Sequence, residues 1–433
     1  MSRFKSINAL VGIALVFSFT LGTGAVAAAA SHHARPAAQK PFKGVHLTVW
    51  DFFPYTPFNT PERVTFTKLA NQWAKANGAT ITDTQPAAGV NPAFIADPKK
   101  GPDVLMGPDD EVGAWEGSHL LSPTKLDRTL YTPAANAGCT LAGKTWCYPW
   151  ALESIMLYYN KAYVSASQMA KLKTWAELGA WANKFHSQNP SKYGFADQIS
   201  ETYKANPFLT AYGGGDLQHT AKGYTGKVIL NSSATVKGLD LFKSFFGASG
   251  SGAVDKYLLD GSYDGDLTNG TAAIVLTGPW DDANYKGHIN YGVAPLPGVK
   301  VGKKIEYGKT FLGVQTLAVN KYSKNQKAAQ AFAAWAGIHM ELPLYHVGAR
   351  IPASKAGLKA VASIPELKEY GKQFLHAEPL PNVPQMGYVW NCAADAIELT
   401  FKGNGTAASN LATAQAKVDS YIKAGSGSCA GPS

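Results

Sequence analysis

The sequence lacks the motifs that mark several large enzyme classes. It has no Gly-x-x-x-x-Gly-Lys-Ser/Thr phosphate loop, no Gly-x-Ser-x-Gly nucleophile elbow and no His-Glu-x-x-His zinc helix. The glycine run Gly213–Gly215 lacks the strand-then-helix setting of a dinucleotide-binding loop, so we assign it to a turn. We therefore expect no catalytic residues, no metal site and no cofactor.

Charge is also scarce. Charged residues make up 16% of the 433 residues, and 40 basic residues against 30 acidic ones give a formal charge of +10. The basic residues are dispersed, with only Lys99-Lys100 and Lys303-Lys304 as doublets. Nucleic-acid binding needs a concentrated basic surface or a recognisable module, so we expect no nucleic-acid partner. A small anionic ligand remains an alternative.

There are only four cysteines, and none precedes Cys139, which argues against anchoring through an early lipidated cysteine. The segment between Cys139 and Cys147 is typical of a hairpin that turns at Ala142-Gly143. Cysteines facing each other across such strands can reach the Cα separation of about 5.5 Å that a disulfide needs. This pairing leaves Cys392 for Cys429. Three pairings are possible, and four free thiols are the remaining alternative.

Residues 1–30 have the pattern of a secretory signal peptide. Arg3 and Lys5 precede the apolar run 9–19, and small residues occupy much of 22–30. We expect its removal and export across the cytoplasmic membrane; a retained anchor is the alternative. Residues 31–43 form a flexible lead-in, and no later stretch is apolar enough to cross a bilayer. We therefore expect a soluble, periplasmic or extracytoplasmic protein.

Hydrophobic periodicity predicts strands that alternate with helices. The predicted strands cover residues 45–50, 79–82, 103–106, 157–160, 192–196, 271–277, 291–294 and 311–320. The predicted helices cover residues 61–77, 174–186, 233–246, 323–336, 365–375, 385–402 and 406–424. Thr174–Glu177 and Ser323–Gln326 match the capping box that starts a helix. The alternation indicates an α/β protein with parallel sheets, in which ligands bind beyond the carboxyl ends of strands.

Four stretches, in chain order, carry a family resemblance. They are Gly101–Asp110 with Gly117–Leu121; Tyr148–Glu153 with Leu157–Lys161 and Thr174–Glu177; Ala272–Trp280 with Asn290–Pro297; and Pro381–Met386 with Trp390. Together they resemble the maltose- and maltodextrin-binding members of the extracellular solute-binding proteins (family 1) of ABC sugar importers. Each stretch alone is a weak signal, but four in the same order are a strong one.

The resemblance implies a two-lobed periplasmic-binding-protein fold of type II, with a hinge that the chain crosses more than once and a helical C-terminal region. The implied N-terminal lobe comprises residues 44–152 and 316–356, the C-terminal lobe residues 153–315 and 357–425, and a tail residues 426–433. The implied function is that of a monomeric substrate-binding protein. It closes on a maltodextrin-type oligosaccharide and presents it to membrane permease subunits.

The resemblance also assigns six ligand-binding residues: Asp110, Glu153, Glu201, Tyr203, Trp280 and Trp390. The three aromatic residues match stacking positions for the apolar face of a sugar ring, and the three carboxylates match acceptors for its hydroxyl groups. Each also has a structural alternative, such as core packing for the tryptophans and helix capping for the aspartate.

Three positions depart from the best-known maltodextrin binders. Gly107 stands where they have a stacking tryptophan, and Glu111 and Ala394 stand where they have arginines. The class of ligand is therefore better determined than its identity. Another disaccharide, a polyol or an anion is the first alternative. A secreted glycosidase or lyase, with Glu153 and Glu201 as its carboxylate pair, is the second.

Overall fold

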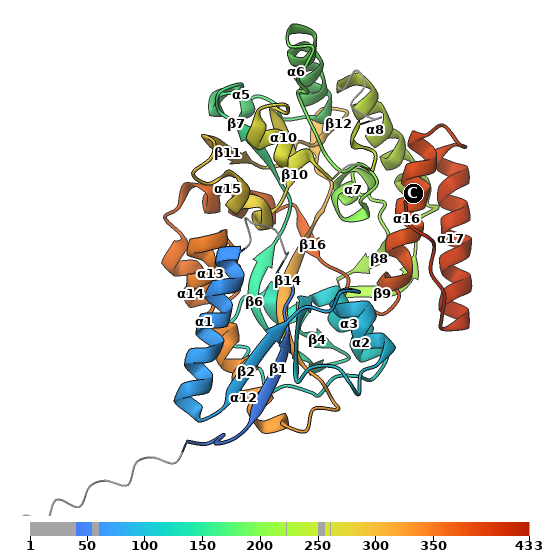
Figure 1. The fold of residues 1–433 in the computed structure, drawn as a ribbon. Helices are drawn as coiled ribbons and strands as arrows, with labels where there is room; N and C mark the ends of the chain where they lie inside the picture. The colour runs from blue at the N-terminus through green and yellow to red at the C-terminus, as the bar shows by residue number, and fades with distance from the viewer. Residues whose placement is uncertain (1–39, 54–59, 222, 250–255, 260, 433) are drawn as a thin grey trace, which may run out of the picture. The chain divides into compact units, whose positions relative to one another are not determined.

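Two β-sheets organise the part of the chain that the structure describes (Figure 1). The structure is a computed structural model, and it describes residues 40–53, 60–221, 223–249, 256–259 and 261–432. The predicted signal peptide and residues 31–39 of the predicted lead-in lie outside these residues, whereas residues 40–43 of the lead-in are described. The strands of the large sheet are β1 (His46–Trp50), β2 (Thr80–Thr84), β3 (Val104–Pro108), β6 (Cys147–Glu153), β14 (Thr310–Val319), β15 (Ile351–Pro352) and β16 (Ala377–Pro379). The small sheet consists of β7 (Met156–Asn160), β10 (Ile274–Thr277) and β11 (Tyr291–Ala294).

The prediction of parallel sheets is wrong for most strand pairs. The large sheet has the order β15-β6-β14-β3-β1-β2, with β16 paired to β14. Strand β1 runs parallel to β2 and β3, but β14 runs antiparallel to both β3 and β6, and the small sheet is antiparallel throughout. The reason is the path of the chain. Strand β6 leads out of the large sheet into β7 of the small one, whereas β14 runs back, so β6 and β14 can pair only antiparallel.

Helices cover both faces of the large sheet. On one face, α1 (Thr60–Asn77) and α12 (Gln326–His339) contact each other, and Phe66 and Phe332 pack there with Leu47 of β1. On the other face lie α2 (Val90–Ala96) and α3 (Asp109–Gly117), whose Phe94 and Trp115 rings meet edge to face at 5.8 Å. The sheet therefore separates two apolar cores, and the helix after β3 starts at its carboxyl end.

A third apolar core surrounds the small sheet. Its helices are α5 (Ala166–Met169), α6 (Trp175–Gln188), α7 (Thr202–Leu209), α8 (Ser233–Ser249), α10 (Tyr263–Asn269), the 3-10 turn η1 (Pro279–Asp281) and α11 (Asp282–Tyr285). Trp175 at the start of α6 packs against Phe208 of α7, with ring centroids 4.1 Å apart. The predicted capping box at this helix start is confirmed, since the Thr174 hydroxyl accepts from the Glu177 N–H and the Glu177 carboxylate accepts from the Thr174 N–H.

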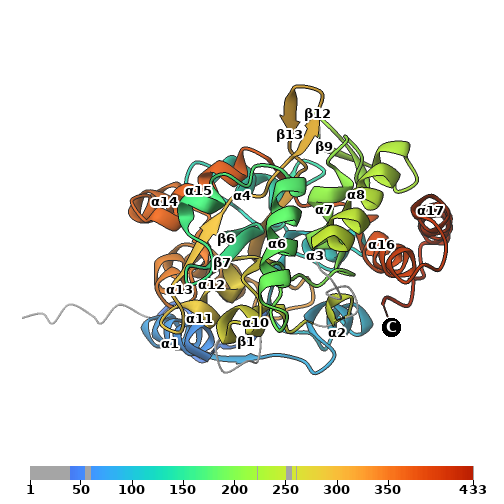
Figure 2. The same ribbon diagram turned by 90° about the horizontal axis from the view of Figure 1, so that it is seen from above.

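In the described part of the chain, three short hairpins and six further helices complete the fold. The hairpins are β4–β5 (Thr140–Leu141 and Lys144–Thr145), β8–β9 (Leu217–Thr220 and Gly223–Val228) and β12–β13 (Val299–Val301 and Lys304–Glu306). The remaining helices are α4 (Pro133–Gly138), α13 (Glu341–Gly348), α14 (Lys355–Val361), α15 (Pro365–Phe374), α16 (Met386–Phe401) and α17 (Ala407–Ala424). Helices α16 and α17 lie side by side in both ribbon views (Figures 1 and 2). The helical C-terminal region was correctly predicted.

Two local predictions are wrong. Residues 192–196 form only isolated parallel bridges, at Tyr193 and Ala196, to the strand edge of β10 and its approach. Gly194 between them lies against the backbone of Ala182 in α6, so the segment follows the helix and pairs only intermittently. The second predicted capping box does not form either. The Ser323 hydroxyl donates to the Asp103 carboxylate at 2.5 Å, and α12 begins at Gln326 without a side-chain cap.

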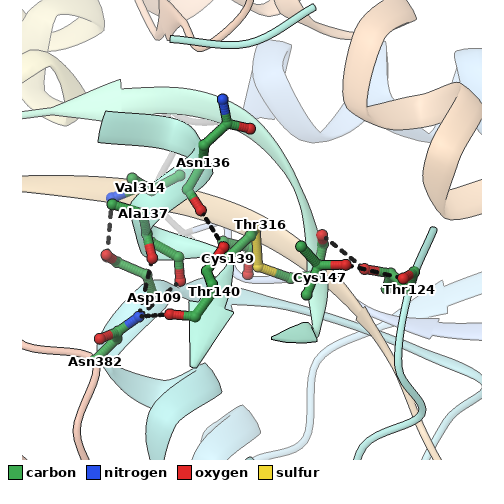
Figure 3. The surroundings of a disulfide bond; sticks show 12 residues. Asp109, Thr124, Asn136, Ala137, Cys139, Thr140, Cys147, Val314, Thr316 and Asn382 are labelled. Atoms are coloured by element: carbon green, nitrogen blue, oxygen red, sulfur yellow. Dashed lines mark hydrogen bonds between the residues drawn. A yellow bond between two sulfur atoms is a disulfide. The ribbon is translucent and has the colours of Figure 1, made fainter. Parts of the chain in front are cut away.

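Both predicted disulfides are present. The hairpin disulfide, Cys139–Cys147, joins residues on either side of the hairpin β4–β5, which turns at Ala142 and Gly143 with positive φ at both. Figure 3 shows it beside the amide of Asn382, which donates to three carbonyls in residues 137–140. The tail disulfide, Cys392–Cys429, ties the residues after α17 to α16, with Cα atoms 5.0 Å apart.

Candidate functional site

All six residues predicted to bind a ligand line one cavity of about 820 Å³. They come from five elements that are distant in sequence: Asp110 from α3, Glu153 from the end of β6, Glu201 and Tyr203 from the start of α7, Trp280 from η1, and Trp390 from α16. Helix α16 contacts both α3 and α7, so the elements that carry Trp390, Asp110 and Tyr203 are neighbours (Figure 1). Elements that follow the carboxyl ends of β1, β3, β6 and β10 all contribute lining residues, as expected for an α/β fold.

The three aromatic residues form a connected group on the cavity wall. The ring of Tyr203 lies 6.0 Å from that of Trp280 at an interplanar angle of 72°, and 6.5 Å from that of Trp390 at 33°. Phe311 of β14 supports the group from behind, 5.5 Å from Tyr203 and 5.9 Å from Trp390. Both tryptophans stay partly exposed, so their faces are available inside the cavity.

The position of Trp280 depends on a glycine. Its ring folds back over Gly278, where a Cβ atom would collide with the six-membered ring. Strand β10 ends at Thr277, and Pro279 at the first position of η1 fixes the turn that follows. The sequence Gly-Pro-Trp at this strand end therefore brings an indole back toward the sheet, and any larger residue in place of the glycine would displace it.

Trp390 is oriented by a carboxylate. Its indole N–H donates to Asp110 Oδ2 at 3.0 Å, and its backbone carbonyl accepts from the Thr202 hydroxyl at 2.9 Å. Burial raises the pKa of Asp110 to about 6, and the hydrogen bond from the indole lowers it less than burial raises it. The neighbouring Asp109 caps no helix end but accepts from the Val314 N–H of β14 at 2.9 Å (Figure 3). The carboxylate that faces the cavity is thus Asp110.

Glu153 belongs to a buried ion network. Its Oε1 accepts from Arg350 Nη1 and its Oε2 accepts from the Gln315 amide at 2.9 Å. The same guanidinium donates through Nε to Glu62 Oε1 at 2.7 Å. Burial opposes the charge of Arg350, but the two carboxylates raise its pKa above the ordinary value. Glu153 therefore lies at the cavity with both oxygens already engaged, and Arg350 and Gln315 reach the cavity beside it.

Glu201 lines the same cavity, next to a buried lysine. The Lys204 ammonium is 3.1 Å from Glu201 Oε2, 3.7 Å from Asp197 Oδ1 and 3.4 Å from the centre of the Tyr263 ring. The lysine side chain is 1% exposed, whereas the Glu201 side chain is 38% exposed and faces the cavity. Burial opposes the charge of Lys204, yet Glu201 and its other neighbours raise the pKa of the lysine. The exposed Glu201 carboxylate is consequently held in place by the buried Lys204 ammonium.

The comparison with known families agrees with this architecture. Residues 59–337, well over half of the chain, match the model of the bacterial extracellular solute-binding protein family. The chain belongs to this family. The predicted recognition is confirmed, and so is the predicted two-lobed α/β fold class. The boundaries of the two lobes stay a prediction.

Three relatives of this solute-binding protein have informative names. A galactooligosaccharide-binding protein of Bacillus subtilis is 28% identical over 75% of this chain and 78% of its own. A maltooligosaccharide ABC transporter solute-binding lipoprotein of Streptococcus pneumoniae is 28% identical over 90% of this chain and 91% of its own. A maltodextrin-binding protein of Bacillus subtilis is 28% identical over 68% of this chain and 72% of its own.

The cavity of this solute-binding protein also contains residues that sequence reasoning missed, chiefly Arg350, Gln315 and Pro432. Arg350 and Gln315 carry no local motif, and each meets Glu153 from more than 160 positions away in the chain. Pro432 reaches the cavity because the tail disulfide holds the preceding residues on α16. The predicted disulfide was the one signal that pointed to this last contribution.

The departures noted in the sequence have a structural counterpart. A Cβ on Gly107 would be 2.9 Å from the Trp115 ring and 2.5 Å from the Glu111 carboxylate, so these two side chains fill the space beside the glycine. Burial raises the pKa of Glu111 well above its usual range. Ala394 lines the cavity one helical turn after Trp390. A stacking side chain at position 107 is therefore not only missing but excluded by its neighbours.

Among residues 40–432, leaving out the short undescribed stretches, no helix has both the length and the apolar character needed to cross a membrane. In the same described part of the chain, no three or more His, Cys, Asp or Glu side chains gather as a metal-ion site would require.

Proposed function

We propose that this solute-binding protein serves an ABC importer and binds a neutral oligosaccharide of the maltodextrin type in the cavity between α3, α7, η1 and α16. The observation that carries the proposal is the composition of that cavity. Three aromatic rings and three carboxylates from separate elements line one space of about 820 Å³, which is within the usual range for small-molecule sites.

A sugar suits this combination of groups. The pyranose ring offers an apolar face to the indoles of Trp280 and Trp390, and its hydroxyl groups can donate to Asp110 and Glu201. An anion suits it less well. Among the described residues that line the cavity, Arg350 is the one cation. It is already paired with Glu153 and Glu62, and the lining carboxylates would repel a negative ligand.

The names of the relatives support an oligosaccharide as the ligand. They fall into two series of sugars, the maltooligosaccharides and the galactooligosaccharides. Two relatives are named for maltooligosaccharide or maltodextrin and one for galactooligosaccharide. We favour the α-glucan series because the four motif stretches resemble its binders. We further propose that the protein acts outside the cytoplasmic membrane without catalysis and delivers its sugar to permease subunits after the two lobes close on it.

The test is a fluorescence and calorimetric titration with maltose, maltotriose, β-1,4-galactobiose, cellobiose and a polyol. Wild-type protein should bind a member of the first three with a saturable change in tryptophan emission. Trp280→Ala and Trp390→Ala should each weaken that binding by at least about tenfold. Trp335→Ala is the matched control, since Trp335 stacks on His339 of α12 at 4.6 Å, away from the cavity lining.

Two results would count against the proposal. Equal losses in all three tryptophan variants would show that the cavity residues act only through stability. Cleavage of maltotriose during the titration would identify a carbohydrate-active enzyme instead. A third measurement, small-angle scattering, should show compaction when the bound sugar saturates the protein, because lobe closure reduces the radius of gyration.

A further inference from the structure

The residues after α17 run along α16 and end their described course at the cavity. This tail segment, Ser426–Pro432, has no regular secondary structure. Yet Pro432 lines the cavity together with Trp390, Asn391 and Ala394 of α16. An irregular segment without helical or strand hydrogen bonds needs other contacts to hold one position.

The tail segment has such contacts at three of its residues. Gly427, with φ of +118°, lies against the Tyr421 ring so closely that a Cβ would collide with it. Cys429 is 5% exposed and is bonded to Cys392, and its carbonyl accepts from the Asn391 amide at 3.4 Å. Tyr421 belongs to α17, whereas Cys392 and Asn391 belong to α16, so these contacts hold the segment against both helices.

The last contact turns the segment toward the cavity. The Gly431 N–H donates to the carboxylate of Asp395, which lies on α16 next to the cavity-lining Ala394. Gly431 has φ of +82°, a conformation that other residues rarely adopt. After this bend Pro432 lines the same cavity as Ala394, a position at which α16 offers the cavity only a methyl group.

We propose that the tail segment is a wall of the ligand cavity and limits the number of sugar units that the cavity accepts at its α16 end. The inference rests on the proposed function, because it assigns a specificity role within the same site. The pyrrolidine ring of Pro432 cannot swing aside as a flexible side chain can, and the disulfide three residues earlier limits how far the backbone can move. Sugar units that extend past Trp390 toward Ala394 would meet it.

The first test removes the wall and keeps both disulfides. A variant truncated after Cys429 lacks Pro432 but retains Cys392–Cys429. Calorimetry would compare it with the wild type, using the disaccharide and the pentasaccharide of the α-1,4-glucan and β-1,4-galactan series. The truncated protein should bind the pentasaccharide about tenfold more tightly, with little change for the disaccharide.

The second test enlarges the wall. Pro432→Trp should weaken pentasaccharide binding by about tenfold and leave the disaccharide nearly unchanged. Its matched control is Ser428→Trp, an exposed position in the same segment that does not line the cavity. Cys392→Ala/Cys429→Ala should reproduce the truncation, whereas Cys139→Ala/Cys147→Ala, which removes the hairpin disulfide, should not change the ratio of the two affinities.

The outcomes separate this inference from the proposed function. If the wild type binds a disaccharide but the affinity ratio is the same in every tail variant, the wall does not limit length and only the inference fails. Equal weakening of both sugars would also overturn it, because a merely structural role predicts that pattern. If no protein binds any of the four sugars, the proposed function fails, and the inference fails with it.

Discussion

The buried network around Arg350 permits a quantitative prediction. The Arg350 side chain is 6% exposed, and its guanidinium donates to Glu62, 0% exposed, and to Glu153, 6% exposed. The substitution Arg350→Met keeps a long side chain but removes the cation. Two buried carboxylates are then left without their shared partner, which typically costs about 3–5 kcal/mol.

The assay is equilibrium unfolding in urea, followed by tryptophan fluorescence, for Arg350→Met and two companion variants. Lys372→Met is the matched control, because its partner Glu369 and its own side chain are 30% and 62% exposed, and such pairs contribute at most about 1 kcal/mol. The triple variant Glu62→Gln/Glu153→Gln/Arg350→Met removes all three charges and should recover much of the loss.

Either of two results would refute this reasoning. A loss below about 1 kcal/mol in Arg350→Met would mean that water or a nearby group compensates the two carboxylates. A triple variant no more stable than the single one would mean that packing of the long side chain, and not charge, is what the protein loses. A change in the urea slope between variants would mean that the compactness of the folded or unfolded state has changed, or that the unfolding is not two-state.

Three further predictions concern the cavity and the disulfides. The pKa of Asp110 is raised to about 6 in the folded protein. Between about pH 4 and 6 this group is therefore protonated in the folded protein but ionised in the unfolded chain. Wild-type stability should fall as the pH rises through that range, relative to Asp110→Asn, in thermal melts. As the pH rises through the same range, the sugar affinity of the wild type should rise, and that of Asp110→Asn should not. Gly278→Ala should displace the Trp280 ring and weaken sugar binding at least about tenfold in the calorimetric titration. From their sequence separations of 8 and 37, loss of the hairpin disulfide should cost about 2.5 kcal/mol and loss of the tail disulfide about 3.8 kcal/mol in urea unfolding; the reverse order would contradict the chain-entropy account.

The parts of the fold that could be predicted are those whose signals are local. The hairpin between Cys139 and Cys147 shows itself through a Gly at its turn, and the start of α6 through Thr174 and Glu177 three positions apart. The second capping box failed because Ser323 Oγ accepts from the Asn325 N–H and not from the Gln326 N–H, while its hydroxyl donates to Asp103, which is 220 positions away. Pairing direction failed for a similar reason, since alternation of strands and helices does not reveal where a strand crosses to another sheet.

The candidate site shows the same division. The six predicted residues were found through a resemblance of whole motifs, and the structure brings all of them to one cavity. Arg350, which holds Glu153, was missed because a lone arginine has no pattern and its two partners are 197 and 288 positions away. The role of Glu153 as a free acceptor is accordingly less simple than the motif suggests, because both of its oxygens are already occupied.

The path of β6 and β14 has a mechanical consequence. Glu153 and Gln315 are hydrogen-bonded to each other, and they lie on the two strands that carry the chain out of the large sheet and back into it. Any bending of this pair of strands therefore changes the floor of the cavity at once. Binding of a ligand in the cavity and the angle between the two lobes would be coupled directly, without a relay of intervening residues.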